Sequence, residues 1–252
     1  YEIASCLVGS EMCIRDSKEE KEAYLEKLAD YDTYMQKLNA EWTEKQKLLE
    51  KTCEELSGIR RKNATVLTQK LKDALIGLNF LTVEFDIAVR PGQTITAKGY
   101  DDVEFLISTN PGESLKPLSQ VASGGELSRI MLAIKTVLAG RDEIDTLIFD
   151  EIDTGISGRT AWKVAEQLSV LSGAHQVICI THLPQIAAMA DVHFVIEKSS
   201  TDDMTITDIH KVSAEESLAE LARLLGSDAL TEAALSNAKE MKEQAGMFKE
   251  TR

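Results

Sequence analysis

The sequence is poor in cysteine, and the cysteines that it has lie far apart. Only four occur among 252 residues, and none forms a CxxC pair, which argues against a disulfide framework or a zinc site. Cys179 lies in the apolar run QVICI, where we expect a small buried hydrophobe. Three of the four histidines, His175, His193 and His210, also lack metal-ligand spacing. These absences turn attention to His182.

Long apolar runs and an excess of basic charge are missing as well. No apolar stretch approaches the length of a membrane span, and no segment is typical of a secretory signal. Acidic residues outnumber basic ones by 42 to 28, which gives a formal net charge of −14. This charge argues against a generally basic nucleic-acid surface, although it allows a local basic patch. We therefore expect a soluble cytoplasmic protein with no membrane partner.

The first 17 residues, YEIASCLVGSEMCIRDS, differ in character from the rest of the chain. They show no clear hydrophobic period, and they stop abruptly at a highly charged run. We expect residues 1–17 to be a translated cloning or sequencing adaptor fused to a truncated reading frame. A short native strand is the alternative.

Charged residues dominate residues 18–62, where proline is absent. Apolar side chains recur there at alternating spacings of three and four from Leu28 to Ile59, with two polar interruptions. This heptad stripe predicts one strand of a coiled coil, and a lone amphipathic helix packed on a globular domain is the alternative. Gly58 and the following RRKN predict the end of the regular coil. The basic cluster at residues 60–62 is interpreted as a solvated helix end.

Residues 63–252 carry the patterns of an α/β domain. Regularly spaced leucines from Leu67 to Leu78 predict a short amphipathic helix that ends near Gly77. A β meander is predicted from the alternation in FLTVEFDIAV, a turn at RPG, and the segments TITAK and VEFLIS. After NPGES, helix, apolar strand, helix and apolar strand succeed one another. This order predicts a parallel sheet that is buried on both faces.

Two adjacent carboxylates end the first apolar strand of that sheet. Asp150 and Glu151 directly follow residues 146–149, and holding both at the carboxyl end of a buried strand is costly without a cation or a substrate. In a nucleotide-binding interpretation, Asp150 helps to hold Mg²⁺ through its water shell. Glu151 would orient or deprotonate the water that attacks the γ-phosphate. The alternative is a strand that ends in a solvated acidic turn.

His182 follows the next apolar strand, in THLPQ. It is therefore predicted at the same edge of the sheet as the two carboxylates, on a neighbouring strand. An imidazole there can hydrogen-bond a γ-phosphate oxygen and sense whether it is present. A purely structural histidine is the alternative.

A serine and two glycines precede a helix that is predicted to run roughly to Ala139. Ser123 and the backbone N–H groups of Gly124 and Gly125 lie at its amino end, where free donors and the helix dipole attract anions. Glycine lets the main chain approach a phosphate with no Cβ in the way. An ordinary serine cap, which needs no ligand, is the alternative.

Taken in this order, the motifs resemble those of the ATP-binding-cassette (ABC) ATPases. SGGE is similar to the signature motif, LIFDE to the Walker B motif, DTGISG to the D-loop and THLPQ to the switch-histidine loop. The heptad arm before them is similar to the structural-maintenance-of-chromosomes (SMC) branch rather than to transporters. The stretches STNPGESLKPLSQVASGGELSRIMLAIK, FDEIDTGISGR and THLPQIAAMADVHFVIEK carry the resemblance, which extends from roughly Lys18 to the end.

The resemblance implies a fold and a set of roles. The chain would be α/β, with residues 63–252 forming the carboxyl-terminal lobe of an ABC-type ATPase head that has a parallel sheet core and a β meander. Residues 18–62 would be one strand of an antiparallel coiled coil. ATP and Mg²⁺ would bind, with Glu151 and His182 catalytic and Asp150 at the metal. Nucleotide contacts would come from Ser123, Gly124, Gly125, Glu126, Asp153 and Gly155.

One motif of such ATPases is missing. No GxxxxGK[ST] loop occurs in the sequence, and in this family that phosphate-binding loop lies in the amino-terminal half, before the coil. We therefore expect the chain to be a carboxyl-terminal half that begins inside the returning arm. Alone, it is expected to be inactive.

The resemblance also implies a function and partners. It predicts an ATPase in DNA double-strand break repair and recombination, whose heads engage one another through ATP. Its partners would be DNA, the missing amino-terminal half with its Walker A loop, and a second copy of the protein, at the nucleoid in the cytoplasm. The alternatives are another chromosome-organising ATPase of the SMC branch and a coiled-coil scaffold whose head has lost catalysis.

Overall fold

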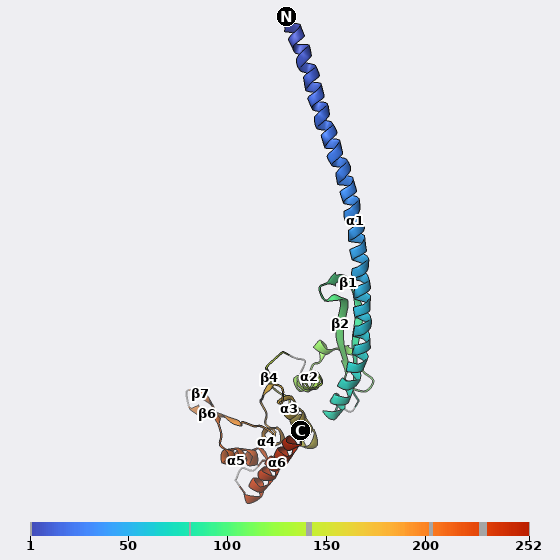
Figure 1. The fold of residues 1–252 in the computed structure, drawn as a ribbon. Coiled ribbons are helices and arrows are strands. Elements are labelled where there is room, and N and C mark those ends of the chain that lie inside the picture. The colour runs from blue at the N-terminus through green and yellow to red at the C-terminus, as the bar shows by residue number, and fades with distance from the viewer. Residues whose placement is uncertain (1, 81, 140–142, 202–203, 227–230, 252) are drawn as a thin grey trace. The chain divides into compact units, whose positions relative to one another are not determined.

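The structure of the protein is a computed structural model that describes residues 2–80, 82–139, 143–201, 204–226 and 231–251 (Figure 1). Side chains are described in these ranges except for residues 2–13, 27, 199–201, 204 and 205. The chain forms two compact units. One comprises Tyr1–Arg60 and Gly92–Tyr100, and the other comprises Arg61–Pro91 and Asp101–Arg252.

Helix α1 (Glu2–Gly77) is continuous through segments that the sequence predicts to be separate. The helix passes through Gly58 without interruption, because a glycine inside a helix costs only about 1 kcal/mol relative to alanine. The predicted end of the regular coil near Gly58 stays a prediction. A short strand in residues 1–17 is excluded, since residues 2–17 are helical. Whether residues 1–17 are native, and the division of the chain at residues 17 and 62, stay predictions.

The predicted heptad stripe on α1 is uncovered in this chain. Six of its large side chains are exposed, namely Leu28, Tyr31, Leu38, Trp42, Leu49 and Ile59. An apolar stripe at heptad spacing is the surface that a second coiled-coil strand covers. The coiled coil itself stays a prediction.

The β meander is present, with strand bounds that differ from the predicted ones. Strands β1 (Glu84–Thr96), β2 (Gly99–Ser108) and β3 (Lys116–Pro117) form one sheet in the order β1-β2-β3, and the 3₁₀ helix η1 (Leu118–Gln120) comes next. The turn predicted at residues 90–92 is wrong, because β1 continues through it and the chain turns at residues 97–98. As an edge strand, β1 tolerates Pro91, which has no N–H to donate.

The predicted alternation of helices and parallel strands is confirmed. It comprises α2 (Gly124–Leu138), β4 (Thr146–Phe149), α3 (Gly158–Leu171), β5 (Gln176–Cys179) and the short α4 (Pro184–Ala188) (Figure 1). Strands β4 and β5 pair in parallel, with Thr146 opposite Gln176 and Phe149 opposite Cys179. The carboxyl ends of the two strands therefore lie at one edge.

Only one face of the β4–β5 sheet is buried. Leu147 and Phe149 belong to the main core, which also takes in side chains of α2, α3 and the carboxyl-terminal part of α1. On the opposite face Ile148 is 67% exposed, and Ile178 and Ile180 are also exposed. The prediction of burial on both faces is therefore wrong for the described chain, because the core covers only the face that carries Leu147.

The remaining elements form a hairpin and two helices. Strands β6 (Phe194–Thr201) and β7 (Met204–Lys211) pair antiparallel, and α5 (Ala214–Leu224) and α6 (Glu232–Glu250) come after them. Helix α5 begins with a capping box in which Ser213 and Glu216 bind one another's backbone N–H groups. A second core cluster joins α4, α5 and α6. Among the described helices, none combines the length and the apolar character that a membrane crossing requires.

Candidate functional site

The site is built where β4 and β5 end side by side. Asp150 and Glu151 follow β4, and His182 lies three residues after β5. The N–H of Ile180 donates to the carbonyl of Phe149 at 3.0 Å, which keeps the two chain segments paired up to the edge. The structure thus brings the carboxylate pair and the histidine to one edge, as the sequence predicts.

Asp153 connects the two segments. Its side chain is only 4% exposed, and its Oδ2 accepts hydrogen bonds from the Thr181 hydroxyl at 2.7 Å and from the His182 N–H at 2.8 Å. The His182 Nδ1 lies 2.9 Å from the same oxygen. Asp153 is therefore engaged within the protein, and its predicted contact with a nucleotide stays a prediction.

Helix α2 begins at this edge with a serine cap. The Ser123 Oγ accepts from the Glu126 N–H at 3.4 Å, and the Ser123 carbonyl accepts from the Leu127 N–H at 3.0 Å. The cap uses one of the four N–H groups that a helix start leaves free. The ordinary cap that the sequence allows is thus present, and the role of Ser123 toward a phosphate stays a prediction.

The two glycines of SGGE fit against the turn after β4. A Cβ on Gly125 would lie 2.9 Å from the Cβ of Thr154, 3.0 Å from the Glu151 carbonyl oxygen and 3.1 Å from the Thr154 carbonyl oxygen. A Cβ on Gly124 would lie 2.5 Å from the Glu151 Oε2. The helix start and the catalytic candidate are therefore in direct contact, and at Gly125 it is the protein's own backbone that excludes a side chain.

The turn after β4 holds Glu151 in an unusual backbone conformation. The φ angle of Glu151 is 57°, which is in the left-handed region that L-residues other than glycine rarely adopt. The Asp150 Oδ1 accepts from the Glu151 N–H at 2.9 Å, and the Glu151 carbonyl accepts from the Thr154 N–H at 3.1 Å. Gly155 has a φ of 74°, so a glycine suits the end of this turn.

Arg129 is a residue of the site that the sequence reasoning missed. It is buried on α2, and its Nη1 donates to the carbonyl of Thr154 at 2.7 Å and to that of Ile152 at 3.3 Å. Its guanidinium carbon lies 5.7 Å from the centre of the Phe80 ring. Burial lowers the pKa of Arg129, and the charge of Glu126 partly opposes that shift. The signal in the sequence was an arginine directly before the apolar run IMLAI.

The edge is electrostatically negative. Burial raises the pKa of Cys179 to about 12, and the charges of Asp153 and Asp150 contribute to that rise. Cys179 is half-buried and its thiol stays protonated, so it acts as the small apolar side chain that the sequence predicts. The negative charge of these carboxylates would attract a cation to this edge.

The residues present fit part of a nucleotide site. Asp150 is exposed and can hold a hydrated Mg²⁺, which prefers one or two carboxylates together with water and phosphate oxygens. The described residues contain no group of three or more His, Cys, Asp or Glu side chains that could hold a metal by themselves. Ser123 and Gly124 are exposed at the helix start.

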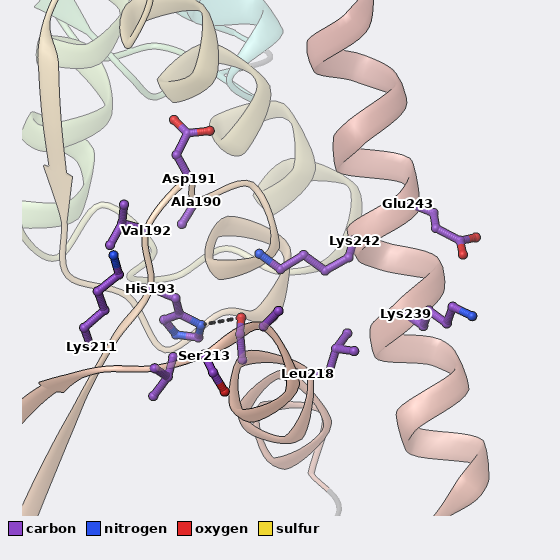
Figure 2. A pocket seen from close by; sticks show the side chains of 13 residues that line it. Ala190, Asp191, Val192, His193, Lys211, Ser213, Leu218, Lys239, Lys242 and Glu243 are labelled. Atoms are coloured by element: carbon purple, nitrogen blue, oxygen red, sulfur yellow. Dashed lines mark hydrogen bonds between the residues drawn. The ribbon is translucent and has the colours of Figure 1, made fainter.

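A separate cavity of about 490 Å³ lies between the 190–193 loop, α5 and α6. The Nδ1 of His193 lies 2.9 Å from the Ser217 Oγ, within hydrogen-bond distance. Figure 2 shows the Lys242 side chain of α6 pointing toward the His193 ring. Burial, and then the charge of Lys242, lower the pKa of His193. Burial also lowers the pKa of Lys242, together with the charge of Lys249. None of the predicted site residues lines this cavity.

The elements and the site residues follow one another in a recognisable order. A glycine-rich helix start, a strand ending in Asp-Glu and a strand followed by Thr-His meet in that chain order at one edge of a parallel sheet. A long charged helix precedes them. This arrangement resembles the carboxyl-terminal lobe of an ABC-type ATPase head of the SMC-like branch.

Comparisons with known proteins make the assignment more specific. The chain is 41% identical over 198 residues to the DNA repair protein RecN of Halalkalibacterium halodurans, covering 77% of the chain and 35% of that protein. It is 39% identical over 250 residues to RecN of Bacillus subtilis, covering 93% of the chain and 43% of that protein. It is 54% identical over 143 residues to RecN of Treponema pallidum, covering 57% of the chain and 25% of that protein. The chain resembles the carboxyl-terminal half of RecN. It spans less than half the length of these relatives.

Two further comparisons concern families and solved structures. No protein-family model matches the chain. A solved structure described as concerning ATP-driven dimerization of SMC ATPases is similar with a TM-score of 0.41 and 17% identity, covering 69% of this chain and 99% of the other. The Smc head domain of Pyrococcus yayanosii is similar with a TM-score of 0.47 and 20% identity, covering 66% of this chain and 30% of the other.

Proposed function

We propose that this chain is the carboxyl-terminal part of an SMC-like ATPase that acts in DNA double-strand break repair and recombination. The observation that carries the proposal is the convergence at one sheet edge of the α2 start, the Asp150–Glu151 pair and His182. A Cβ on Gly124 would touch the Glu151 carboxylate, and Asp153 joins the same turn to His182. The similarity to proteins named DNA repair protein RecN supports the biological role.

Each residue at the edge has a chemical task in this proposal. Glu151 is the general base, or the group that orients the attacking water. Asp150 contributes a carboxylate to hydrated Mg²⁺, which would offset negative charge on the nucleotide. His182 donates a hydrogen bond to a γ-phosphate oxygen. Ser123 and the N–H groups of Gly124 and Gly125, with Glu126 beside them, belong to the signature end of α2, which binds anions through its dipole and donors.

The proposal requires other polypeptide segments to complete the nucleotide site. The phosphate-binding loop would come from the amino-terminal half of the protein, and the α2 start would close over ATP held by a second copy. Two exposed apolar surfaces support the first requirement. They are the sheet face with Ile148, Ile178 and Ile180, and the heptad stripe on α1. Contiguous exposed apolar side chains often mark an interface.

The partners and location are part of the same proposal. DNA is the substrate on which the full protein acts, and the nucleoid in the cytoplasm is its place of action. With a formal net charge of −14, the chain would meet DNA through a local basic patch or by enclosing it between arms.

The test is hydrolysis of ATP by the longer protein that carries the phosphate-binding loop. Glu151→Gln should retain ATP binding and slow single-turnover hydrolysis by about 10²–10⁴-fold, because the amide keeps the shape of the side chain but cannot accept a proton. Glu240→Gln, at an exposed position on α6, is the matched control and should leave the rate unchanged. A reduction of less than about fivefold for Glu151→Gln would remove Glu151 from this role.

A further inference from the structure

We propose that Asp153 is a positioning residue that fixes the orientation and the tautomer of His182. This inference rests on the proposed function, in which His182 meets the γ-phosphate of ATP. It gives Asp153 a task other than contact with the nucleotide.

Three polar atoms of one loop converge on a single oxygen of Asp153. Its Oδ2 accepts from the Thr181 hydroxyl at 2.7 Å and from the His182 N–H at 2.8 Å, and it lies 2.9 Å from the His182 Nδ1. The acceptor is buried at 4% exposure, whereas the His182 side chain is 72% exposed. A buried oxygen that accepts several hydrogen bonds has little freedom to move. Asp153 Oδ2 can therefore hold the exposed His182 ring in one orientation.

The crowding around Oδ2 determines where the hydrogen on the ring lies. An ionised carboxylate only accepts hydrogen bonds. A proton placed on Oδ2 would face the Thr181 hydroxyl and the His182 N–H, which both already donate to that oxygen. The hydrogen of this contact therefore belongs to Nδ1 of His182. The neutral ring then carries its hydrogen on Nδ1, and Nε2 is left for a ligand.

The same arrangement prepares the ring to bind a phosphate. When Nε2 also takes up a proton, the imidazolium has two donors, one directed to Asp153 and the other free for a phosphate oxygen. The carboxylate then compensates the charge of the ring, and charge-assisted hydrogen bonds of this kind are short and strong. Without Asp153, the exposed ring could rotate, and either nitrogen could face the ligand.

Asp153 also fixes the backbone that carries the ring. The Thr181 hydroxyl donates to Asp153 and accepts from the Leu183 N–H at 3.0 Å. Residues 181–183 are thereby tied to the turn after β4 just before α4 begins. Because Thr154, next in sequence, contacts Gly125, one turn contacts both the helix start and the histidine loop.

The direct test is nitrogen NMR of the ¹⁵N-labelled 252-residue chain without nucleotide. Long-range ¹H–¹⁵N correlations distinguish the two tautomers, and His182→Gln assigns the signal. At a pH where the ring is neutral, we expect His182 to carry its hydrogen on Nδ1. Asp153→Asn should shift the ring toward the Nε2–H tautomer, because the amide NH₂ can donate to Nδ1. The signals of His175, His193 and His210 should not move, which shows that the variant is folded.

Two NMR results would overturn the inference. One is a wild-type His182 with its hydrogen on Nε2, and the other is a tautomer that Asp153→Asn leaves unchanged. Thr181→Val is a second variant. It removes one donor and leaves the carboxylate, so the Nδ1–H tautomer should persist.

A kinetic measurement on the longer protein separates this inference from the proposed function. Asp153→Asn should slow ATP hydrolysis by about tenfold to hundredfold, the range known for carboxylates that orient metal-bound histidines. In a His182→Gln background the same change should add less than about twofold, because the two residues act as one unit. A tautomer effect without a kinetic effect would contradict the role of His182 in hydrolysis. A kinetic effect of His182→Gln without a tautomer effect of Asp153→Asn would contradict the positioning role.

Discussion

At the scale of single residues, Glu151 is notable because its backbone is strained where its side chain is expected to act. Its φ of 57° is in a region that costs a residue other than glycine about 1–3 kcal/mol. The surrounding turn maintains the conformation through the Asp150 side chain and the Thr154 N–H. The sequence could identify Glu151 by its position after a strand, but it contained no signal for the strain.

This strain predicts an unusual order of stability at Glu151. Both Glu151→Ala and Glu151→Gly remove the carboxylate, but only glycine adopts a positive φ freely, so the glycine variant should be more stable by about 1 kcal/mol. At Glu240, in the interior of α6, alanine should instead be more stable than glycine by about 1 kcal/mol. Urea unfolding followed by circular dichroism measures both pairs. The same order at both positions would show that the turn stores no strain.

At the scale of elements, most of what the sequence predicted depended on local signals. The serine cap and the apolar period predicted the start of α2, and short apolar runs predicted β4 and β5. The predictions that failed depended on context. Pro91 does not end β1 because β1 is an edge strand, and one face of the β4–β5 sheet is left uncovered by the described chain. The contact between Gly125 and the 151–154 turn joins residues more than 25 positions apart, and no local pattern encodes it.

That contact predicts different outcomes for the two glycines of SGGE. Gly125→Ala should destabilise the chain by about 1–3 kcal/mol, because its Cβ would meet backbone oxygens that cannot move independently. Gly124→Ala should change the stability little, because its Cβ meets only the end of the flexible Glu151 side chain. Urea midpoints of the two variants provide the measurement. Equal losses of stability would mean that the helix start does not press on the turn.

Displacement of the Glu151 side chain gives the Gly124 variant a second readout. In the longer protein, Gly124→Ala should slow ATP hydrolysis although the fold is unaffected, since the carboxylate must leave its place. Gly125→Ala would reduce both the stability of the fold and the rate of ATP hydrolysis. The pair therefore separates a structural glycine from one that leaves room for the catalytic side chain.

At the scale of the whole molecule, the described chain is organised around surfaces that it does not cover itself. The isoleucine face of the β4–β5 sheet and the stripe on α1 are apolar and exposed. Ser123, Glu151 and His182 are also exposed to solvent. This chain itself supplies the helix cap Ser123, the strained turn residue Glu151 and the proposed positioning residue Asp153. In the proposed function the phosphate cradle comes from the amino-terminal half, and the opposing signature end comes from a second copy.

The role of a second copy leads to a prediction about Ser123. Aspartate and asparagine are both good N-caps, so Ser123→Asp and Ser123→Asn should both keep α2 intact. Only the aspartate places a negative charge at the helix end where the γ-phosphate of the partner's ATP would lie, and like charges at this short range repel strongly. Substitution at Ser123 is more informative than substitution at Gly125, where any side chain also disturbs the fold.

The measurement is light scattering of the longer protein in a Glu151→Gln background, with and without ATP. Ser123→Asn should retain ATP-dependent association of heads, and Ser123→Asp should abolish it. Both variants should bind a fluorescent ATP analogue as tightly as the parent protein, because each protomer's own phosphate-binding loop is unchanged. If the aspartate and asparagine variants associate equally with ATP, the α2 start does not meet the partner's nucleotide, and Ser123 serves only as the cap of its helix.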